Sequence, residues 1–304
     1  MALVYTSDLL VEEVKNCGMI PEAQSLGSQD AQILSHLSEI LQSELALELM
    51  KIREEYYIVT ERLALTAGKT KYRIPDRAMG LKIRDLMYVD GSGDRYYLKG
   101  IPREELQRYK NSTDWPSGYY IEGCYINLVM SGISPTGYLE VSYYFRPSDL
   151  VLTEEAAQVL TVSTSSLTCT TVPSTFTVGA LYDIHGQYSG AEIKSWSLVG
   201  TPGVGTMTFT AAIDGSVFGN LPVEVGDWVC LAGESVIPAL PRELQPVLVR
   251  GAALHMAEAF GDAQSVQIHG ALYKESLTRA MKVFENRVEG KPMRLTGKRS
   301  SMWS

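Results

Sequence analysis

Helix-forming sequence lies at both ends of the chain and encloses a strand-forming middle, and this order limits the possible fold more than any other feature. Residues 29–57 place leucine, isoleucine and tyrosine at steps of three and four, which is the period of an amphipathic helix. The stretch TSDLLVEEVKNC before Gly18 predicts a shorter helix upstream, with Thr6, Ser7 or Asp8 as its cap.

Two more helices are expected near the other end of the sequence. The first, over 240–262, opens with Pro241, and the second covers 263–289. Only Gly261-Asp262 connects them, and so short a connection makes the helices antiparallel neighbours. The apolar residues expected on their inner faces are Leu244, Val247, Leu248, Leu254, Phe260, Tyr273, Leu277, Ala280 and Phe284. Glu275 and Arg279 can pair one turn apart on the outer surface.

The middle of the chain has the composition of β-strands. DGSGD at 90–94 is a turn signal between two β-favouring runs. Residues 118–130 and 137–147 are expected to form a second hairpin, and 102–109 a helical turn. Short alternating runs rich in Ser, Thr, Val and Gly over 159–232 predict a second β module, either a small barrel or a sandwich.

Together these patterns predict an α+β fold. Residues 1–57 and 240–290 are expected to form one discontinuous antiparallel helical bundle. Antiparallel β modules are inserted into it at 58–158 and 159–239. Residues 291–304 would follow as an extended C-terminal segment, since Pro292 prevents simple continuation of the preceding helix, which is expected to end near Glu289-Gly290.

Charge is distributed unevenly along the chain. The formal net charge is −8, and without the four basic residues of 291–304 the remainder carries −12. Eight acidic residues stand against a single Lys194 in 151–240. Such a segment repels phosphate, so a nucleic-acid-binding function is disfavoured.

The sequence predicts neither a targeting segment nor disulfide bonds. The N-terminus has no basic region followed by an apolar one, so we expect no signal peptide, and carboxylates interrupt every apolar run, so we expect no membrane span. Four cysteines lie far apart without a C-x-x-C pair, which favours reduced, buried thiols.

Residue patterns for catalysis, cofactors or metals are missing. HMAE at 255–258 spaces a histidine and a carboxylate as metal-binding helices do, but we find no convincing second pair of this kind. The glycine-rich stretch 200–206 lacks the Lys of a phosphate-binding loop, and the twelfth position counted from Asp90 is Ile101, where a calcium loop needs Glu. We therefore predict no enzyme activity, no cofactor and no metal. The tyrosine-rich strands around Tyr143 and Tyr144 leave a carbohydrate-binding module open as an alternative.

Several segments in their order resemble the head-to-tail adaptor proteins of tailed bacteriophages, also called head-completion or connector proteins. They are DAQILSHLSEILQSELALELMKIREEYY, YRIPDRAMGLKIRDLMYVD, GYLEVSYYFRPSDLV and VEVGDWVCLAGESVIPALPRELQPVLVRGAALHMAEAFGD. The resemblance implies a structural virion protein at the head–tail junction, assembled in the host cytoplasm. Another phage tail component, such as a baseplate, tail-terminator or fibre-attachment protein, stays open as an alternative.

The resemblance also implies partners. Twelve copies would form a ring below the portal, extend the DNA channel used in genome ejection, and present a platform to the tail nozzle or other tail proteins. Genomic DNA would pass through without specific binding, and no membrane is involved. The C-terminal segment of each subunit would reach into the portal.

Residues 291–304, here called the docking arm, have the chemistry for such a role. Arg294, Lys298 and Arg299 would meet acidic portal surface, and Leu295, Met302 and Trp303 would fill apolar pockets. The alternative is a frayed terminus without function. The residues predicted to dock are Lys291, Pro292, Met293, Arg294, Leu295, Lys298, Arg299, Met302 and Trp303.

Overall fold

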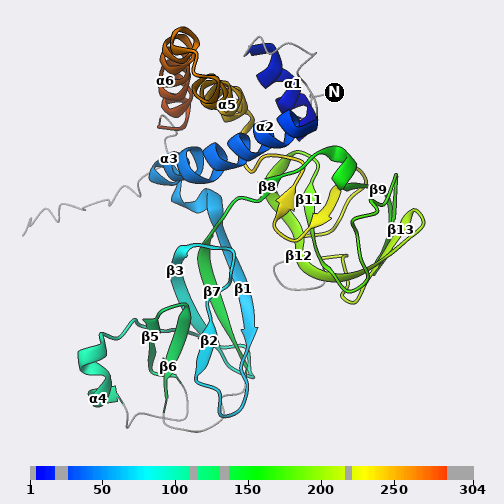
Figure 1. The fold of residues 1–304 in the computed structure, drawn as a ribbon. Coiled ribbons are helices and arrows are strands. Elements are labelled where there is room, and N and C mark those ends of the chain that lie inside the picture. Colours follow the sequence, from blue (N-terminus) through cyan, green and yellow to red (C-terminus); the bar gives the residue numbers. More distant parts are fainter. Residues whose placement is uncertain (1–4, 18–26, 110–115, 131–136, 216–220, 286–304) are drawn as a thin grey trace, which may run out of the picture.

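The chain folds into a helical layer and two β regions (Figure 1). The computed structural model describes residues 5–17, 27–109, 116–130, 137–215 and 221–285. Helices and antiparallel sheets are both present, so the predicted α+β class is confirmed. No helix in these ranges combines the length and apolar character that a membrane span requires.

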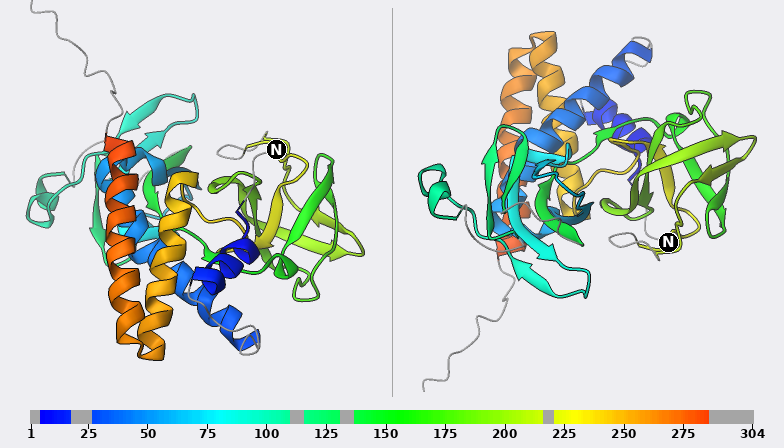
Figure 2. Two further views of the ribbon diagram at one scale, coloured as in Figure 1. Left: turned by 90° about the horizontal axis from the view of Figure 1, so that it is seen from above. Right: turned by 90° about the horizontal axis from the view of Figure 1, so that it is seen from below.

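Helices from both ends of the chain share one hydrophobic core, in which Leu10, Leu37, Leu41 and Leu248 are fully buried. The α5 and α6 helices run side by side, while α2 lies obliquely to them (Figure 2). The antiparallel bundle inferred from the sequence stays a prediction. The helices are α1 (Ser7–Cys17), α2 (Gly27–Ile40), α3 (Ala46–Ile52), α5 (Gln245–Phe260) and α6 (Ala263–Glu285).

The long helix predicted over 29–57 is confirmed from Gly27 to Ile52, but it contains a π-helical turn. After α2 the backbone makes a π-helical turn, Leu41–Leu45, before α3 begins, and Glu54–Tyr57 form a 3-10 turn that leads into the first strand. A π-helical turn changes the phase of the side chains that follow it, and such turns are frequent at functional sites. The apolar spacing of three and four predicts the helix but not this change of phase.

The connection between α5 and α6 has a local explanation. Gly261 takes the left-handed conformation, φ +71°, which ends α5. The Asp262 carboxylate then accepts hydrogen bonds from the backbone amides of Gln264 (3.1 Å) and Ser265 (3.2 Å), which caps α6. A hydrogen bond from the Ser265 hydroxyl, together with these two backbone bonds, lowers the pKa of Asp262. The expected Glu275–Arg279 pair is present at 2.5 Å, whereas Phe260, expected on the inner face, is exposed.

The first β region contains two sheets, with strand orders β1-β7-β3-β4 and β2-β6-β5. Its core includes Ile74, Leu86, Ile126 and Val141. The strands are β1 (Ile58–Ala64), β2 (Lys71–Arg73), β3 (Ala78–Val89), β4 (Arg95–Tyr97), β5 (Gly118–Glu122), β6 (Tyr125–Val129) and β7 (Tyr138–Phe145), and a 3-10 turn (Arg103–Glu105) precedes α4 (Leu106–Tyr109).

One of the two predicted hairpins in this region is wrong. The DGSGD turn does join β3 to β4, as expected. However, 118–130 forms a hairpin within itself, in which β5 pairs with β6 across the turn at Gly123-Cys124. β7 instead lies in the other sheet, between β1 and β3. Strand-forming residues near one another in sequence predict strands, but they do not decide which strands pair.

The second β region is a closed six-stranded barrel in the order β10-β13-β12-β11-β14-β9. Tyr182, Ile184, Met207 and Val229 fill its interior. The β12–β13 hairpin points away from the helical layer (Figures 1 and 2). The strands are β9 (Ala157–Val162), β10 (Ser166–Cys169), β11 (Leu181–Gly186), β12 (Ser189–Gly203), β13 (Thr206–Phe209) and β14 (Trp228–Leu231). The domain boundaries inferred from the sequence stay predictions.

Hydrogen bonds tie the helical layer to the segments that enter and leave the barrel. β8 (Asp149–Leu150), before the barrel, pairs in parallel with β15 (Glu234–Ser235), after it. Ser7 at the start of α1 bonds to both neighbouring segments, through its amide to Val236 (2.8 Å) and its hydroxyl to Val151 (2.5 Å). The Tyr57 hydroxyl donates to the carbonyl of Ala239 (2.6 Å).

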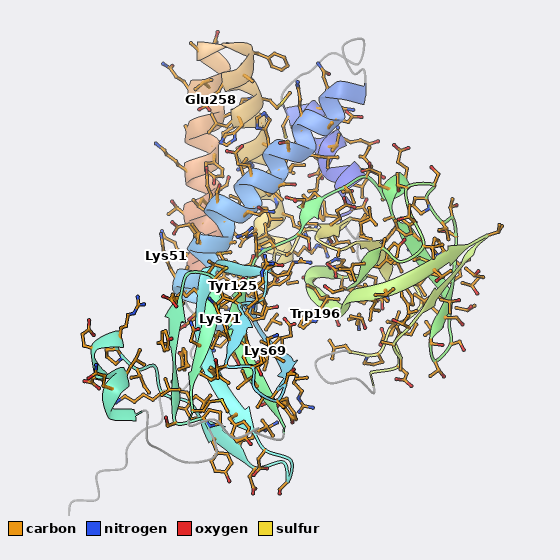
Figure 3. All side chains as sticks on the ribbon, turned by 60° about the horizontal axis from the view of Figure 1, so that its bottom comes forward. Lys51, Lys69, Lys71, Tyr125, Trp196 and Glu258 are labelled. Carbon is orange, nitrogen blue, oxygen red and sulfur yellow. The ribbon has the colours of Figure 1, made fainter. Side chains whose placement is uncertain are left out.

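A buried ion pair joins the barrel to the first β region. Arg77 reaches the carboxylate of Asp183, which is fully buried in β11. The guanidinium of Arg77 also donates to the Ser148 hydroxyl (2.7 Å) and lies 4.6 Å from the centre of the Phe145 ring. Trp196 of β12 lies beside this joint, between the two β regions (Figure 3).

We predict that Arg77→Met lowers the free energy of unfolding by about 3–5 kcal/mol, because it leaves the Asp183 carboxylate buried without its cation. The double variant R77M/D183N should recover part of this loss, since the neutral amide costs less to bury. Urea unfolding followed by tryptophan fluorescence measures both. A loss for R77M within about 0.5 kcal/mol, as for an ordinary surface substitution, would show that the pair does not hold the joint.

Gly190 offers a second test of how tightly the barrel meets the segment leading to α5. A Cβ on Gly190 would lie 1.9 Å from the carbonyl oxygen of Ile237, so Gly190→Ala should destabilise the protein by about 1–3 kcal/mol. Gly270→Ala is the matched control, because the nearest atom to its Cβ is 3.8 Å away and the position is helical. It should leave stability unchanged or raise it by up to about 1 kcal/mol. Equal melting temperatures for G190A and the unmodified protein would contradict the described packing.

Candidate docking surfaces

The predicted docking residues lie outside the described part of the chain, and so does the expected helix end near Glu289-Gly290. What the structure places is the helix before them, α6, at the outer edge of the helical layer (Figure 2). The residues concerned are Lys291, Pro292, Met293, Arg294, Leu295, Lys298, Arg299, Met302 and Trp303.

The outer face of α6 carries exposed apolar side chains. Ile268, Leu272 and Val283 are all exposed and, at roughly 100° per residue, fall within about 60° of one another around the helix, on a different face from Tyr273 and Phe284, which are buried. The Glu275–Arg279 pair lies on the same outer side. The outer face of α6 therefore combines apolar side chains with a charged pair.

A groove of about 630 Å³ lies where the helical layer meets the first β region, between α3, α6 and strands β3 and β7. Glu44, Glu48 and Glu54 provide carboxylates on its wall, and Leu47 is an exposed apolar side chain there. Tyr273 donates a hydrogen bond to Glu44 (2.6 Å). Lys51 and Lys82 line the same groove, and Lys51 pairs with Glu48, so the wall carries charges of both signs.

The Glu54 carboxylate in this groove is also held by the first β region. It accepts a hydrogen bond from the Tyr144 hydroxyl, and this bond raises the pKa of Tyr144. The ammonium of Lys82 lies 4.4 Å from the centre of the same ring. The wall of the groove is thus fixed by contacts between the 3-10 turn Glu54–Tyr57, β3 and β7.

Both ends of the barrel expose apolar side chains. Near the start of β12, Tyr188 and Val225 are exposed. The turns that carry these two residues are joined by a hydrogen bond from the side-chain amide of Gln187 to the carbonyl of Val225 (3.3 Å). At the other end, Val204 protrudes fully from the β12–β13 turn.

The acidic segment 151–240 does not form one acidic face. Asp183 is buried against Arg77, and Asp227 is buried where its carboxylate accepts hydrogen bonds from the backbone amides of Glu224 (2.7 Å) and Gln187 (3.1 Å). Burial raises the pKa of Asp227. The acids of this segment that are exposed are Glu154, Glu155, Asp214 and Glu224.

The two tyrosines named for carbohydrate stacking do not offer their rings on the surface. Tyr143 and Tyr144 are both buried in β7. Tyr125 of β6 is exposed, but the ammonium of Lys71 in the neighbouring strand β2 lies 4.3 Å from its ring centre (Figure 3). Cross-strand packing accounts for these residues.

Two cysteines, Cys169 and Cys230, are buried free thiols, in line with the prediction, and burial raises the pKa of Cys169 to about 11. Cys17, in contrast, is exposed at the end of α1. Cys124 is partly buried in the turn between β5 and β6.

The four histidines lie in three environments. His185 is buried in the barrel, where its ring nitrogens face the carbonyls of Gly190 (3.3 Å) and Glu234 (2.9 Å), and burial lowers its pKa. His269 lies near Asp262 at the start of α6. His36 and His255, in contrast, pack against each other across α2 and α5.

The contact between His36 and His255 reveals a pair that the sequence analysis missed. His36 is followed three residues later by Glu39, with the same spacing as His255 and Glu258. The repeated H-x-x-E spacing was a signal in the sequence, but only the fold shows that the two segments meet.

Comparison with known proteins identifies the family. The profile described as SU10 adaptor protein matches residues 27–196, which is more than half of the chain and runs from α2 into β12. No curated protein matches the chain. The matched part contains the whole first β region and the Arg77–Asp183 joint to the barrel. The chain therefore belongs to the SU10 adaptor protein family.

Proposed function

We propose that this chain is the head-to-tail adaptor of a tailed bacteriophage, and that its copies form a ring, twelve in number, below the portal. The observation that carries the proposal is the family match over residues 27–196. A phage adaptor is a structural protein of the virion and not an enzyme, and its partners are the portal and tail proteins. The helices of both chain ends would form the part of the ring that faces the portal.

The surfaces described above support assembly. Apolar side chains are exposed on the outer face of α6 and at both ends of the barrel. These sites lie on different sides of one subunit, as a ring requires if each copy contacts two neighbours and also a partner above or below. The barrel, which is far from α6, would then meet the tail nozzle or another tail protein.

The charge distribution supports a role at the DNA channel. Outside the docking arm the chain carries −12, and Glu154, Glu155, Asp214 and Glu224 of the barrel region are exposed. Carboxylates repel the phosphate backbone, so DNA would pass a ring lined by such residues without binding to it.

The docking arm would attach the ring to the portal. Its fourteen residues carry four cations and no carboxylate, and in extended form they could reach roughly 50 Å. A segment that orders only on docking gives up conformational entropy, so one arm binds weakly. Twelve arms in one ring bind together through their high effective concentration, which makes the joint durable.

We predict that Arg294→Ala combined with Trp303→Ala weakens portal binding at least about tenfold, because it removes a charge contact and the largest apolar anchor. The melting temperature should stay unchanged, since the arm follows the folded core. The measurement is co-sedimentation of the purified chain with assembled portal from the same phage. Ser300→Ala with Ser301→Ala is the matched control in the same arm and should bind as the unmodified chain does.

Deletion of residues 291–304 tests the role of the docking arm independently of the ring proposal. If the truncated chain binds portal as tightly as the full chain, the arm is not the docking element, although the ring proposal stands. If the full chain does not bind portal under any condition, the adaptor proposal itself is contradicted.

A further inference from the structure

Two helical segments with the same metal-binding spacing meet in the helical layer. His36 and Glu39 lie one turn apart on α2, and His255 lies on α5. The two imidazole rings are perpendicular, with centres 5.6 Å apart. These three residues come from opposite ends of the chain, and one ligand atom from each lies within 4.8 Å of the others.

This geometry is close to that of a zinc site. A tetrahedral ion with ligand distances of about 2.0–2.1 Å holds its ligand atoms roughly 3.4 Å apart. The side chains of His36 and His255 are 28% and 24% exposed and that of Glu39 is 63% exposed. Because the side chains are partly exposed, they can rotate until their ligand atoms, now within 4.8 Å of one another, reach the separation of about 3.4 Å that zinc requires. An ion can also reach them from solvent.

A buried nitrogen in the cluster lacks a partner. Nδ1 of His36 is inaccessible to solvent and makes no hydrogen bond within the described part of the chain. The closest carboxylate oxygen of Glu39 is 3.8 Å away, which is beyond hydrogen-bonding distance. Buried polar atoms are normally satisfied, so an unsatisfied one calls for an explanation such as an ion.

A further carboxylate stands next to the cluster. Glu44 Oε1 lies 3.9 Å from Nε2 of His255, and Glu44 is held in place by the hydroxyl of Tyr273 on α6. Glu44 belongs to the π-helical turn, whose altered phase sets the direction of its side chain. Such a carboxylate orients a metal-bound histidine or water.

From this arrangement we propose that His36, Glu39 and His255 bind one zinc ion, with water as the fourth ligand beside Glu44. Two imidazoles and one carboxylate form a ligand set that zinc uses widely. The ion would cross-link α2 to α5, and so fasten the N-terminal helices to the pair that leads into the docking arm. The proposal does not depend on the adaptor function.

The test uses the purified full chain after treatment with a chelator. Zinc chloride alone is titrated by calorimetry, and thermal unfolding is measured at several zinc concentrations. We expect one ion per chain and a melting temperature that rises with zinc concentration, because an ion that binds the folded state stabilises it. Cobalt in place of zinc should give the visible absorption of a tetrahedral site.

Three variants assign the ligands. His36→Gln, His255→Gln and Glu39→Gln should each weaken zinc binding at least about tenfold, as loss of a ligand requires. Glu39→Gln keeps the test valid if a histidine variant folds poorly, since this side chain is largely exposed. His269→Gln and Glu275→Gln are matched controls, one for a histidine and one for an exposed carboxylate outside the cluster. Both should bind zinc like the unmodified chain.

Two results would overturn the proposal. One is the absence of zinc binding in the chelator-treated chain, together with a melting temperature that zinc does not change. The other is binding that all three variants retain, which would place the ion elsewhere on the surface.

Discussion

The ion pair between Arg77 and Asp183 is the contact that sets the two β regions relative to each other. Asp183 is fully buried in the barrel, and a buried carboxylate is costly unless its charge and its hydrogen-bonding capacity are satisfied. Arg77 comes from the first β region, 106 residues earlier, and the backbone amides of Ser197 and Gly233 donate the remaining hydrogen bonds at 2.8 and 2.9 Å. The barrel cannot turn away from this position without leaving the carboxylate unpaired.

The helical layer is fixed to the same joint by apolar packing. Phe145, under the guanidinium of Arg77, belongs to the hydrophobic core that the helices of both chain ends build. The hydrogen bonds of Ser7 and Tyr57 hold the segments on either side of the barrel to this layer. One subunit therefore offers its exposed surfaces, namely α6 and the barrel ends, in a fixed relation to each other, which a symmetric ring needs.

Much of the local structure follows from the sequence. The spacing of Leu37, Leu41 and Leu45 predicts the helix, and Gly261-Asp262 predicts the short connection between α5 and α6. Pairing over long distances does not follow, because alternation of apolar residues marks a strand without naming its neighbour. This is why β7 was expected beside 118–130 and lies instead between β1 and β3.

The candidate sites differ in the same way: the sequence predicts those made by one local segment, but not those made by segments far apart in the chain. The composition of 291–304 shows cations and apolar anchors directly, and it generates the docking prediction without any structure. The contact of His36 with His255 depends on the packing of α2 against α5, which no spacing along the chain contains. Likewise, the acids of 151–240 suggest one acidic surface until the fold shows Asp183 and Asp227 buried.

Electron cryo-microscopy of the purified chain assembled on its portal tests the central claim most directly. The account predicts a closed ring, coaxial with the portal and on its tail side, in which residues 291–304 of each subunit are traced against the portal. Density for this chain at the distal end of the tail, or an isolated monomer that forms no ring on the portal, would contradict it.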